Sequence, residues 1–84
     1  MAIDVKLPQL TEGEDDPKEV EEVTVSFWYV EPGEAVQEGA NLVQVRTDKA
    51  TFDVPSPVSG KLVEALIAEE QTARPGDVIA TVEA

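Results

Sequence analysis

The sequence predicts an all-β fold, a sandwich or barrel of short strands, and three observations carry this prediction. Apolar and polar residues alternate over several short segments, which is the period of a half-buried strand. Turn-forming residues separate these segments at close spacing, most densely in PSPVSG at 55–60. Hydrophobic residues make up 42% of the 84 residues, which is enough for the core of one small domain.

The first expected strand covers residues 3–7, where Ile, Val and Leu alternate with charged residues, and it ends at Pro8. The acidic stretch TEGEDDPKEVEE at 11–22 is expected to be a surface loop, because it is polar and contains Gly and Pro. The next strand covers 23–29 and ends at the turn EPGE at 31–34. The apolar residues that share one face of this strand are Val23, Val25, Phe27 and Tyr29.

Four more strands are expected in the second half of the chain. Those at 42–47 and 50–54 flank a tight turn, and the last one, at 78–82, follows the turn RPGD at 74–77. The segment 62–68 is also expected to be a strand, although its alternation is imperfect and its composition would tolerate a helix. The aromatic side chains are expected to fill the core rather than line a ligand pocket; they are Phe27, Trp28, Tyr29 and Phe52.

A weak internal repeat relates the two halves of the chain at an offset of 37 residues. The matched pairs, two of which are identities, are Val25/Leu62, Tyr29/Leu66, Val30/Ile67, Gly39/Gly76, Leu42/Ile79 and Val45/Val82. Two similar halves in one sandwich would explain this repeat. The counterpart of Lys49 would then fall just past the end of the chain, so Lys49 is expected at one pole and the chain ends at the other.

Residues 43–54 predict a β-hairpin whose two-residue loop is Asp48 and Lys49. In this register the polar and apolar faces separate cleanly. The apolar face carries Val43, Val45, Phe52 and Val54, and the polar face carries Gln44, Arg46, Thr51 and Asp53. A slip by half a residue mixes the two faces, and a buried face penalises such a slip strongly. Lys49 is therefore predicted at the outermost point of the hairpin.

The loop position of Lys49 favours glycine, because two-residue hairpin loops usually need positive φ. Another residue in that conformation costs about 1 kcal/mol. Two readings stay open: the loop needs this side chain, or Lys49 is an ordinary solvated lysine in a tolerant type I turn. An exposed lysine amine is almost wholly protonated at neutral pH, so it suits modification by an enzyme that brings an activated acid.

The composition excludes much of enzyme chemistry. The chain has no Cys and no His, so it lacks a thiol nucleophile, the commonest general base and the commonest metal ligands. A net charge of −12 disfavours nucleic acids and anionic membranes as partners, and it fits either a basic partner or a need for solubility. No apolar run could span a membrane, and the start MAIDVKLPQL lacks the pattern of a signal or transit peptide.

The chain resembles a lipoyl domain, the swinging-arm carrier of 2-oxo acid dehydrogenase complexes, over nearly its whole length. The tetrad TDKA at 47–50 matches the lipoylation motif of that family, and PSPVSGKL at 55–62 and GDVIATVEA at 76–84 are also similar to it. The residues at matching spacing around Lys49 are Gly33, Val36, Leu42, Val45, Val54, Gly60 and Leu62.

The resemblance implies a flattened β-barrel or sandwich of two similar four-stranded sheets with quasi-two-fold symmetry. The lysine hairpin would lie at one end and the chain termini at the other. Residues 1–84 would form a single carrier domain, with no catalytic residues and no metal, in the N-terminal part of a longer acyltransferase chain. Lys49 would carry lipoic acid as an amide (N6-lipoyllysine), and Asp48 and Ala50 would help present it to the lipoylating enzyme.

The resemblance also implies four partners. A lipoate ligase or lipoyl transferase would modify Lys49, and a thiamine-dependent 2-oxo acid decarboxylase would reductively acylate the arm. An acyltransferase domain would pass the acyl group to coenzyme A, and dihydrolipoamide dehydrogenase would reoxidise the dithiol. The isolated domain is expected to be monomeric, in a bacterial cytoplasm or, in a eukaryote, in the mitochondrial matrix.

In this family the loop after the first strand contributes to recognition by the decarboxylase. The corresponding loop here matches the family poorly, so a solvated insertion is the other reading. Its candidate recognition residues are Thr11, Glu12, Gly13, Glu14, Asp15 and Asp16.

Two other functions remain open. A biotinyl carrier domain of a carboxylase shares the expected architecture, but its lysine usually lies between methionines, whereas Asp48 and Ala50 flank Lys49 here. A cofactor-free acidic β-sandwich that serves as an interaction module would fit an unmodified Lys49. An autonomous enzyme fits least, because paired acids such as Asp15 and Asp16 lie in an expected loop.

Overall fold

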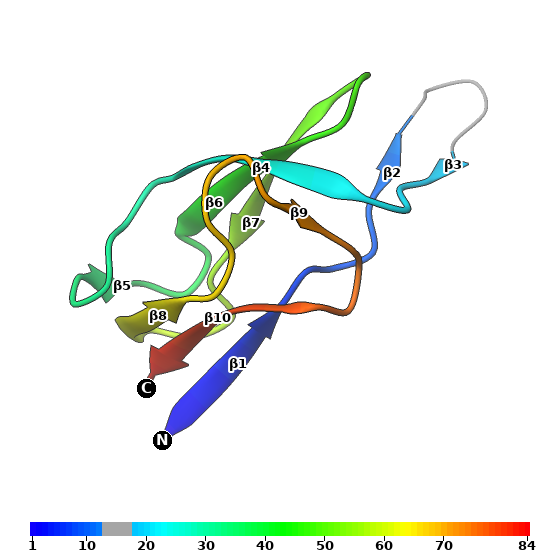
Figure 1. The fold of residues 1–84 in the computed structure, drawn as a ribbon. Coiled ribbons are helices and arrows are strands. Elements are labelled where there is room, and N and C mark those ends of the chain that lie inside the picture. The colour runs from blue at the N-terminus through cyan, green and yellow to red at the C-terminus, as the bar shows by residue number, and fades with distance from the viewer. Residues whose placement is uncertain (13–17) are drawn as a thin grey trace.

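The computed structural model describes residues 1–12 and 18–84. Its strands are β1 (Ala2–Lys6), β2 (Thr11–Glu12), β3 (Lys18–Glu19), β4 (Val23–Trp28), β5 (Ala35–Val36), β6 (Asn41–Arg46), β7 (Thr51–Pro55), β8 (Gly60–Ala65), β9 (Thr72–Ala73) and β10 (Val78–Glu83). Two antiparallel four-stranded sheets have the orders β1-β10-β8-β5 and β7-β6-β4-β9, and β2 pairs with β3 (Figure 1). The predicted all-β sandwich is confirmed. Within the described ranges no helix is long and apolar enough to cross a membrane.

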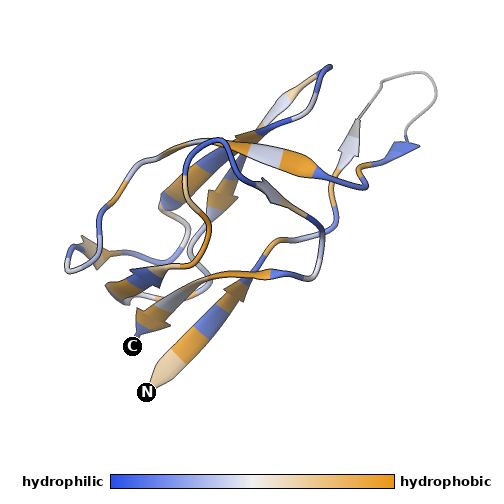
Figure 2. Ribbon diagram, viewed as in Figure 1, coloured by the Kyte–Doolittle hydropathy of each residue, from blue (hydrophilic) through white to orange (hydrophobic). Residues whose placement is uncertain are grey.

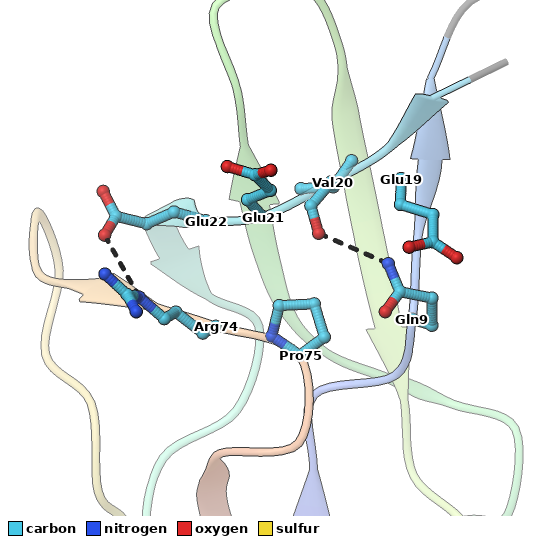
Figure 3. A pocket seen from close by; sticks show the side chains of 7 residues that line it. All are labelled: Gln9, Glu19, Val20, Glu21, Glu22, Arg74 and Pro75. Carbon is cyan, nitrogen blue, oxygen red and sulfur yellow. Dashed lines mark hydrogen bonds and ion pairs between the residues drawn. The ribbon is translucent and has the colours of Figure 1, made fainter.

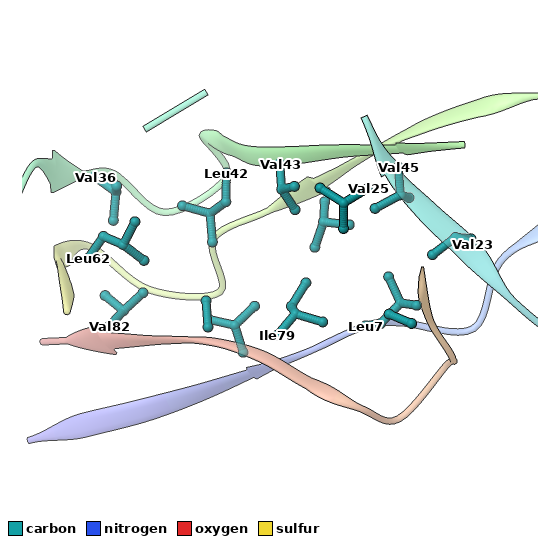
Figure 4. Close-up of a cluster of buried hydrophobic side chains, with 14 of the residues drawn as sticks. Leu7, Val23, Val25, Val36, Leu42, Val43, Val45, Leu62, Ile79 and Val82 are labelled. Carbon is teal, nitrogen blue, oxygen red and sulfur yellow. The ribbon is translucent and has the colours of Figure 1, made fainter. Parts of the chain in front are cut away.

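A single aliphatic core lies between the two large sheets (Figure 4). Hydrophobic and hydrophilic residues alternate along the strands (Figure 2), because each strand gives one face to the core and one to water. Each buried Val or Leu stabilises the fold by roughly 1.5–3 kcal/mol. The largest fully buried side chains are Leu7, Leu42, Leu62, Ile79, Val23, Val25, Val43, Val45, Val54 and Val82.

The two large sheets repeat one backbone pattern, and the offset of 37 residues predicted from the sequence recurs in the strand bounds. It relates β4 to β8, β5 to β9 and β6 to β10. Turn hydrogen bonds follow the same offset: the Gly39 amide donates to the Ser56 carbonyl (2.9 Å), and the Gly76 amide donates to the Leu7 carbonyl (2.8 Å). Both glycines have positive φ, 87° and 94°. The weak repeat therefore reflects two copies of one backbone arrangement.

The edge strands β7 and β1 complete the two halves, because β7 pairs with β6 as β1 pairs with β10. At one end the Thr47 amide donates to the Ala50 carbonyl (2.8 Å) and closes the β6–β7 hairpin. At the other end the Ala84 amide donates to the Met1 carbonyl (3.0 Å). The hairpin tip and the termini lie at opposite ends of an elongated molecule of 40 × 22 × 18 Å (Figure 1), which confirms the predicted poles.

Three details differ from the sequence-based expectations. The stretch 11–22 is not wholly a surface loop, because β2 pairs with β3 within it and Val20 is buried in the core. The expected strand at 62–68 runs from Gly60 to Ala65 and is not helical. The strands β5 and β9 lie outside the expected elements, because two residues are too few to show a period.

The expectation that all four aromatic residues pack in the core is wrong for two of them. Phe27 and Tyr29 are 38% and 42% exposed, and their rings meet edge to face with centroids 4.8 Å apart. A β-bulge inserts Ser26 into β4 and reverses the inward and outward faces for the rest of the strand. Trp28 therefore packs, like Phe52, against the core.

The titration of Tyr29 tests the hydrogen bonds on the outer face of this sheet. Its hydroxyl donates to the Asp53 carboxylate (2.7 Å), which raises the pKa of Tyr29 above its ordinary value, and a hydrogen bond from Gln44 opposes the rise. We expect tyrosinate formation, followed by ultraviolet absorbance of this sole tyrosine, to have a higher midpoint in the folded than in the unfolded chain. Asp53→Ala should lower the folded midpoint.

The raised pKa of Tyr29 determines how the free energy of unfolding changes with pH. The folded chain holds the phenol proton more tightly than the unfolded chain. This contribution to stability is therefore complete below a pH of about 10 and is lost as the pH rises through the folded pKa. Equal midpoints in the folded and unfolded chains would contradict the hydrogen bond between Tyr29 and Asp53.

Glu70 provides a test of backbone strain. It is the one non-glycine residue with positive φ (69°) in the described part of the chain, and its equivalent in the other half is Gly33 (φ 97°). A side chain in this conformation costs about 1 kcal/mol. The exposed ion pair of Glu70 with Arg46 (2.6 Å) stabilises by at most about 1 kcal/mol.

We therefore expect Glu70→Gly to leave the free energy of unfolding nearly unchanged, because it removes the strain together with the ion pair. Glu70→Ala keeps the strain and loses the ion pair, so it should lower the stability by up to about 1 kcal/mol. Urea denaturation measures both variants. Equal stabilities of the two would show that no strain is stored at this position.

Candidate lysine modification site

The β6–β7 hairpin has the register that the sequence predicts. The paired residues are Arg46/Thr51, Val45/Phe52, Gln44/Asp53 and Val43/Val54. Val43, Val45 and Val54 are each at most 1% exposed, so one side of the hairpin is anchored in the core. The anchored register holds Asp48 and Lys49 at the outermost point of the turn.

Thr47 shapes the loop. Its hydroxyl oxygen accepts hydrogen bonds from the amides of Lys49 (3.2 Å) and Ala50 (3.1 Å), while its own amide donates to the Ala50 carbonyl (2.8 Å). Neither Asp48 nor Lys49 has positive φ, so type I is the only one of the four common turn types that fits. The expectation that Lys49 occupies a position that favours glycine is therefore wrong, and the backbone agrees with the tolerant turn of the alternative reading.

The three residues predicted for the attachment motif lie together at this pole. Asp48 and Lys49 are exposed and Ala50 is half-buried. Among residues 1–12 and 18–84 the Lys49 ammonium forms no ion pair, and the one hydrogen bond of this residue is that of its backbone amide. The amine therefore projects into solvent, where an enzyme can reach it.

Arg46 fastens the base of the hairpin to neighbouring elements. Its guanidinium donates to the Ser26 hydroxyl on β4 (3.0 Å) and to the Glu70 carboxylate in the turn before β9 (2.6 Å). Arg46 and Thr51 are the last strand pair before the loop. The loop therefore starts from a fixed base, which limits the directions in which Lys49 can point.

Two open, polar hollows are bordered by residues of the segment 18–22, and one of them lies beside the hairpin. One, of about 320 Å³, is lined by this segment together with Thr47 and Asp48. The other, of about 590 Å³, lies between the segment and Arg74, which faces Glu22 at 3.8 Å (Figure 3). The carboxylates that line both hollows are Glu19, Glu21 and Glu22. The surface next to the lysine is therefore acidic.

The candidate recognition loop is only partly described. Thr11 and Glu12 form β2, which pairs with β3 at the start of the acidic segment. Gly13, Glu14, Asp15 and Asp16 lie outside the described residues. The structure thus brings two of the six candidate residues to the side of the molecule that borders the lysine hairpin.

The Lys49 site offers few of the groups that carry chemistry in proteins. The chain has no His or Cys, and the described residues include no group of three side chains placed to hold a metal ion. The reactive group at the tip is the Lys49 amine, and no general base lies beside it among the contacts of the loop.

Known proteins share this sequence and geometry. A family model described as "Biotin-requiring enzyme", for biotin and lipoyl attachment, matches residues 4–82. The dihydrolipoyllysine-residue acetyltransferase components of the pyruvate dehydrogenase complexes of Staphylococcus aureus and Staphylococcus epidermidis are each 34% identical over 84 residues. The chain spans 18% of the length of these relatives.

A solved structure extends the likeness to the fold. The lipoyl domain of the 2-oxoglutarate dehydrogenase complex from Azotobacter vinelandii superposes with a TM-score of 0.64 at 25% identity. The alignment covers 92% of this chain and 96% of that domain. The chain therefore belongs to the biotin and lipoyl attachment family, as a lipoyl domain homologous to those of the acyltransferase components of 2-oxo acid dehydrogenase complexes.

Proposed function

We propose that this domain is a swinging-arm carrier whose Lys49 bears lipoic acid as an amide on Nζ. The observation that carries the proposal is the position of Lys49, which is exposed at the tip of an anchored hairpin, at the pole opposite the chain termini. The TDKA motif at 47–50 and the family membership support the same residue.

The surroundings of Lys49 fit such a group. No ion pair within the described ranges has to break when the amine becomes an amide. Asp48 and Ala50 flank the lysine, and we propose that the lipoylating enzyme recognises both. The small side chain of Ala50 leaves the loop backbone accessible, and the exposed carboxylate of Asp48 marks one side of the lysine.

When bound to Lys49, the lipoyl group would supply a dithiolane for reductive acylation by a thiamine-dependent decarboxylase, acyl transfer to coenzyme A at an acyltransferase domain, and reoxidation of the resulting dithiol by dihydrolipoamide dehydrogenase. This chain makes and breaks no bonds itself: its hairpin holds Lys49 away from the termini. We propose that residues 1–84 are the N-terminal carrier domain of a longer acyltransferase chain. A flexible tether would keep the local concentration of the arm near the millimolar range.

The acidic surface beside the hairpin is the candidate contact with the decarboxylase. It comprises the segment 18–22 and Asp48, and we propose that the residues of 11–16 take part in the same recognition. Together with a net charge of −12, this surface fits a basic partner face. The staphylococcal relatives are bacterial proteins, and we propose that the domain acts in a bacterial cytoplasm.

Modification of the unmodified protein with lipoate, ATP and a lipoate–protein ligase tests the proposal. We expect one lipoyl increment in the intact mass, mapped to Lys49 by peptide analysis, and complete loss of it in Lys49→Arg. The matched control is Lys61→Arg, because Lys61 is also an exposed lysine but lies within β8, where it pairs with Ala35 and Glu83. This variant should be lipoylated like the wild-type chain.

The alternatives give different masses. A biotin increment with a biotin–protein ligase, and none with lipoate, would make the domain a biotinyl carrier. No increment with either enzyme, each shown to be active on another substrate, would contradict a carrier function and favour a cofactor-free interaction module.

A further inference from the structure

One side-chain atom binds two successive backbone amides at the tip of the lysine hairpin. The Thr47 hydroxyl oxygen accepts hydrogen bonds from the amides of Lys49 (3.2 Å) and Ala50 (3.1 Å). We propose that Thr47 is a positioning residue for the modification of Lys49, and that its hydroxyl fixes the backbone from which the amine is presented. The inference rests on the proposed lipoylation, and Thr47 acts through the loop backbone.

The turn type explains why a hydroxyl is needed here. Two-residue hairpins favour types I′ and II′, because type I does not match the right-handed twist of the flanking strands. Neither Asp48 nor Lys49 has positive φ, so this loop uses neither of the two favoured types. The Ala50 amide, which closes such a turn, is directed to the Thr47 side chain. A side-chain acceptor thus holds a loop that backbone preference alone would leave loose.

The pole that holds the chain termini can be compared with the lysine hairpin, because the two occupy equivalent positions in the two halves of the fold. The bond from the Ala84 amide to the Met1 carbonyl (3.0 Å) is equivalent to the bond from the Thr47 amide to the Ala50 carbonyl (2.8 Å). Ala84 stands 37 residues after Thr47 and has no hydroxyl, yet the closing bond forms there as well. The fold therefore supplies the closing bond at both poles, whereas the bonds from the Lys49 and Ala50 amides to the Thr47 hydroxyl are particular to the lysine pole.

The chemistry of attachment shows where this matters. The Nζ atom of Lys49 attacks the carboxyl carbon of an activated lipoyl donor such as an acyl-adenylate. A C–N bond replaces the bond to the leaving phosphate, and the ammonium releases one proton before the attack and one after it. Thr47 contributes no atom and no proton to this step. A loop that already has its bound conformation needs less ordering when the enzyme engages it, so loss of the hydroxyl should raise KM more than it lowers kcat.

Three variants separate positioning from general stability. Thr47→Val keeps the side-chain shape but lacks the acceptor, and Thr47→Ser keeps the acceptor. Thr51→Val is the matched control, because the exposed Thr51 hydroxyl has no hydrogen-bond partner in the described part of the chain. With lipoate, ATP and a lipoate–protein ligase, we expect kcat/KM for Thr47→Val to fall about tenfold, mainly through KM. The other two variants should stay within about twofold of the wild-type chain.

Amide hydrogen exchange of the unmodified proteins, followed by NMR, gives a readout that needs no lipoylation. The amides of Lys49 and Ala50 should exchange about tenfold faster in Thr47→Val, with no change in the paired amides of β6 and β7. Faster exchange throughout these strands would show a merely structural role and overturn the proposal. An unchanged lipoylation rate in Thr47→Val would overturn it as well.

The two proposals fail in different ways. A wild-type chain that stays unmodified, with a ligase that modifies another lipoyl domain, overturns the proposed function. A wild-type chain that is lipoylated at Lys49, with Thr47→Val equally fast or with Thr47→Ser as slow as Thr47→Val, overturns only the role of the Thr47 hydroxyl.

Discussion

One constraint governs this molecule: two small sheets must share a single aliphatic layer, and each strand must give that layer the correct face. The hairpin that carries Lys49 shows how strict the constraint is. A slip by one residue would exchange the buried Val43 and Val45 for Gln44 and Arg46. Burying a polar or charged group without partners costs several kcal/mol, so the core excludes the alternative registers. The position of the lysine is therefore decided by valines that do not touch it.

The symmetry of the fold gives the two poles different uses. Both poles close with an equivalent backbone hydrogen bond, one within the β6–β7 hairpin and one between the chain ends. A continuous chain can pass through only one of them, so the hairpin pole projects a loop and the other pole holds the termini (Figure 1). An attachment residue at the loop lies as far from the termini as the fold allows, which is the geometry that a tethered carrier requires.

Much of this arrangement could be predicted from the sequence, because it follows from period-two alternation. The register of residues 43–54 and the offset of 37 residues both depend on which aliphatic residues can face the core together. The bulge at Ser26 could not be predicted in this way. A single unpaired residue reverses the faces that follow it, so Phe27 becomes exposed while Trp28 turns inward. The equivalent bulge in β8, at Val63, explains why alternation there is imperfect.

The candidate site was predictable in position but not in its local chemistry. Pattern placed Asp48 and Lys49 in the loop, yet the rule that such loops need positive φ gave the wrong conformation. The missing signal was Thr47, since Ser and Thr hydroxyls commonly accept hydrogen bonds from amides two or three residues later. A rule derived from backbone preferences fails where a side chain supplies the turn's hydrogen bond.

The proposed modification of Lys49 would change the charge of the lysine pole. The Lys49 ammonium lies at the hairpin tip beside Asp48, and the hollow next to the hairpin is lined by Lys18 and by the carboxylates of Glu19, Glu21 and Glu22. Amide formation at Nζ removes that charge and leaves the carboxylates. The modified pole is therefore more acidic than the unmodified one, and a basic partner would meet it faster at low ionic strength. Electrostatic attraction alone would thus lead a basic partner to bind the lipoylated domain in preference to the unmodified one, even where the lipoyl group does not touch the partner.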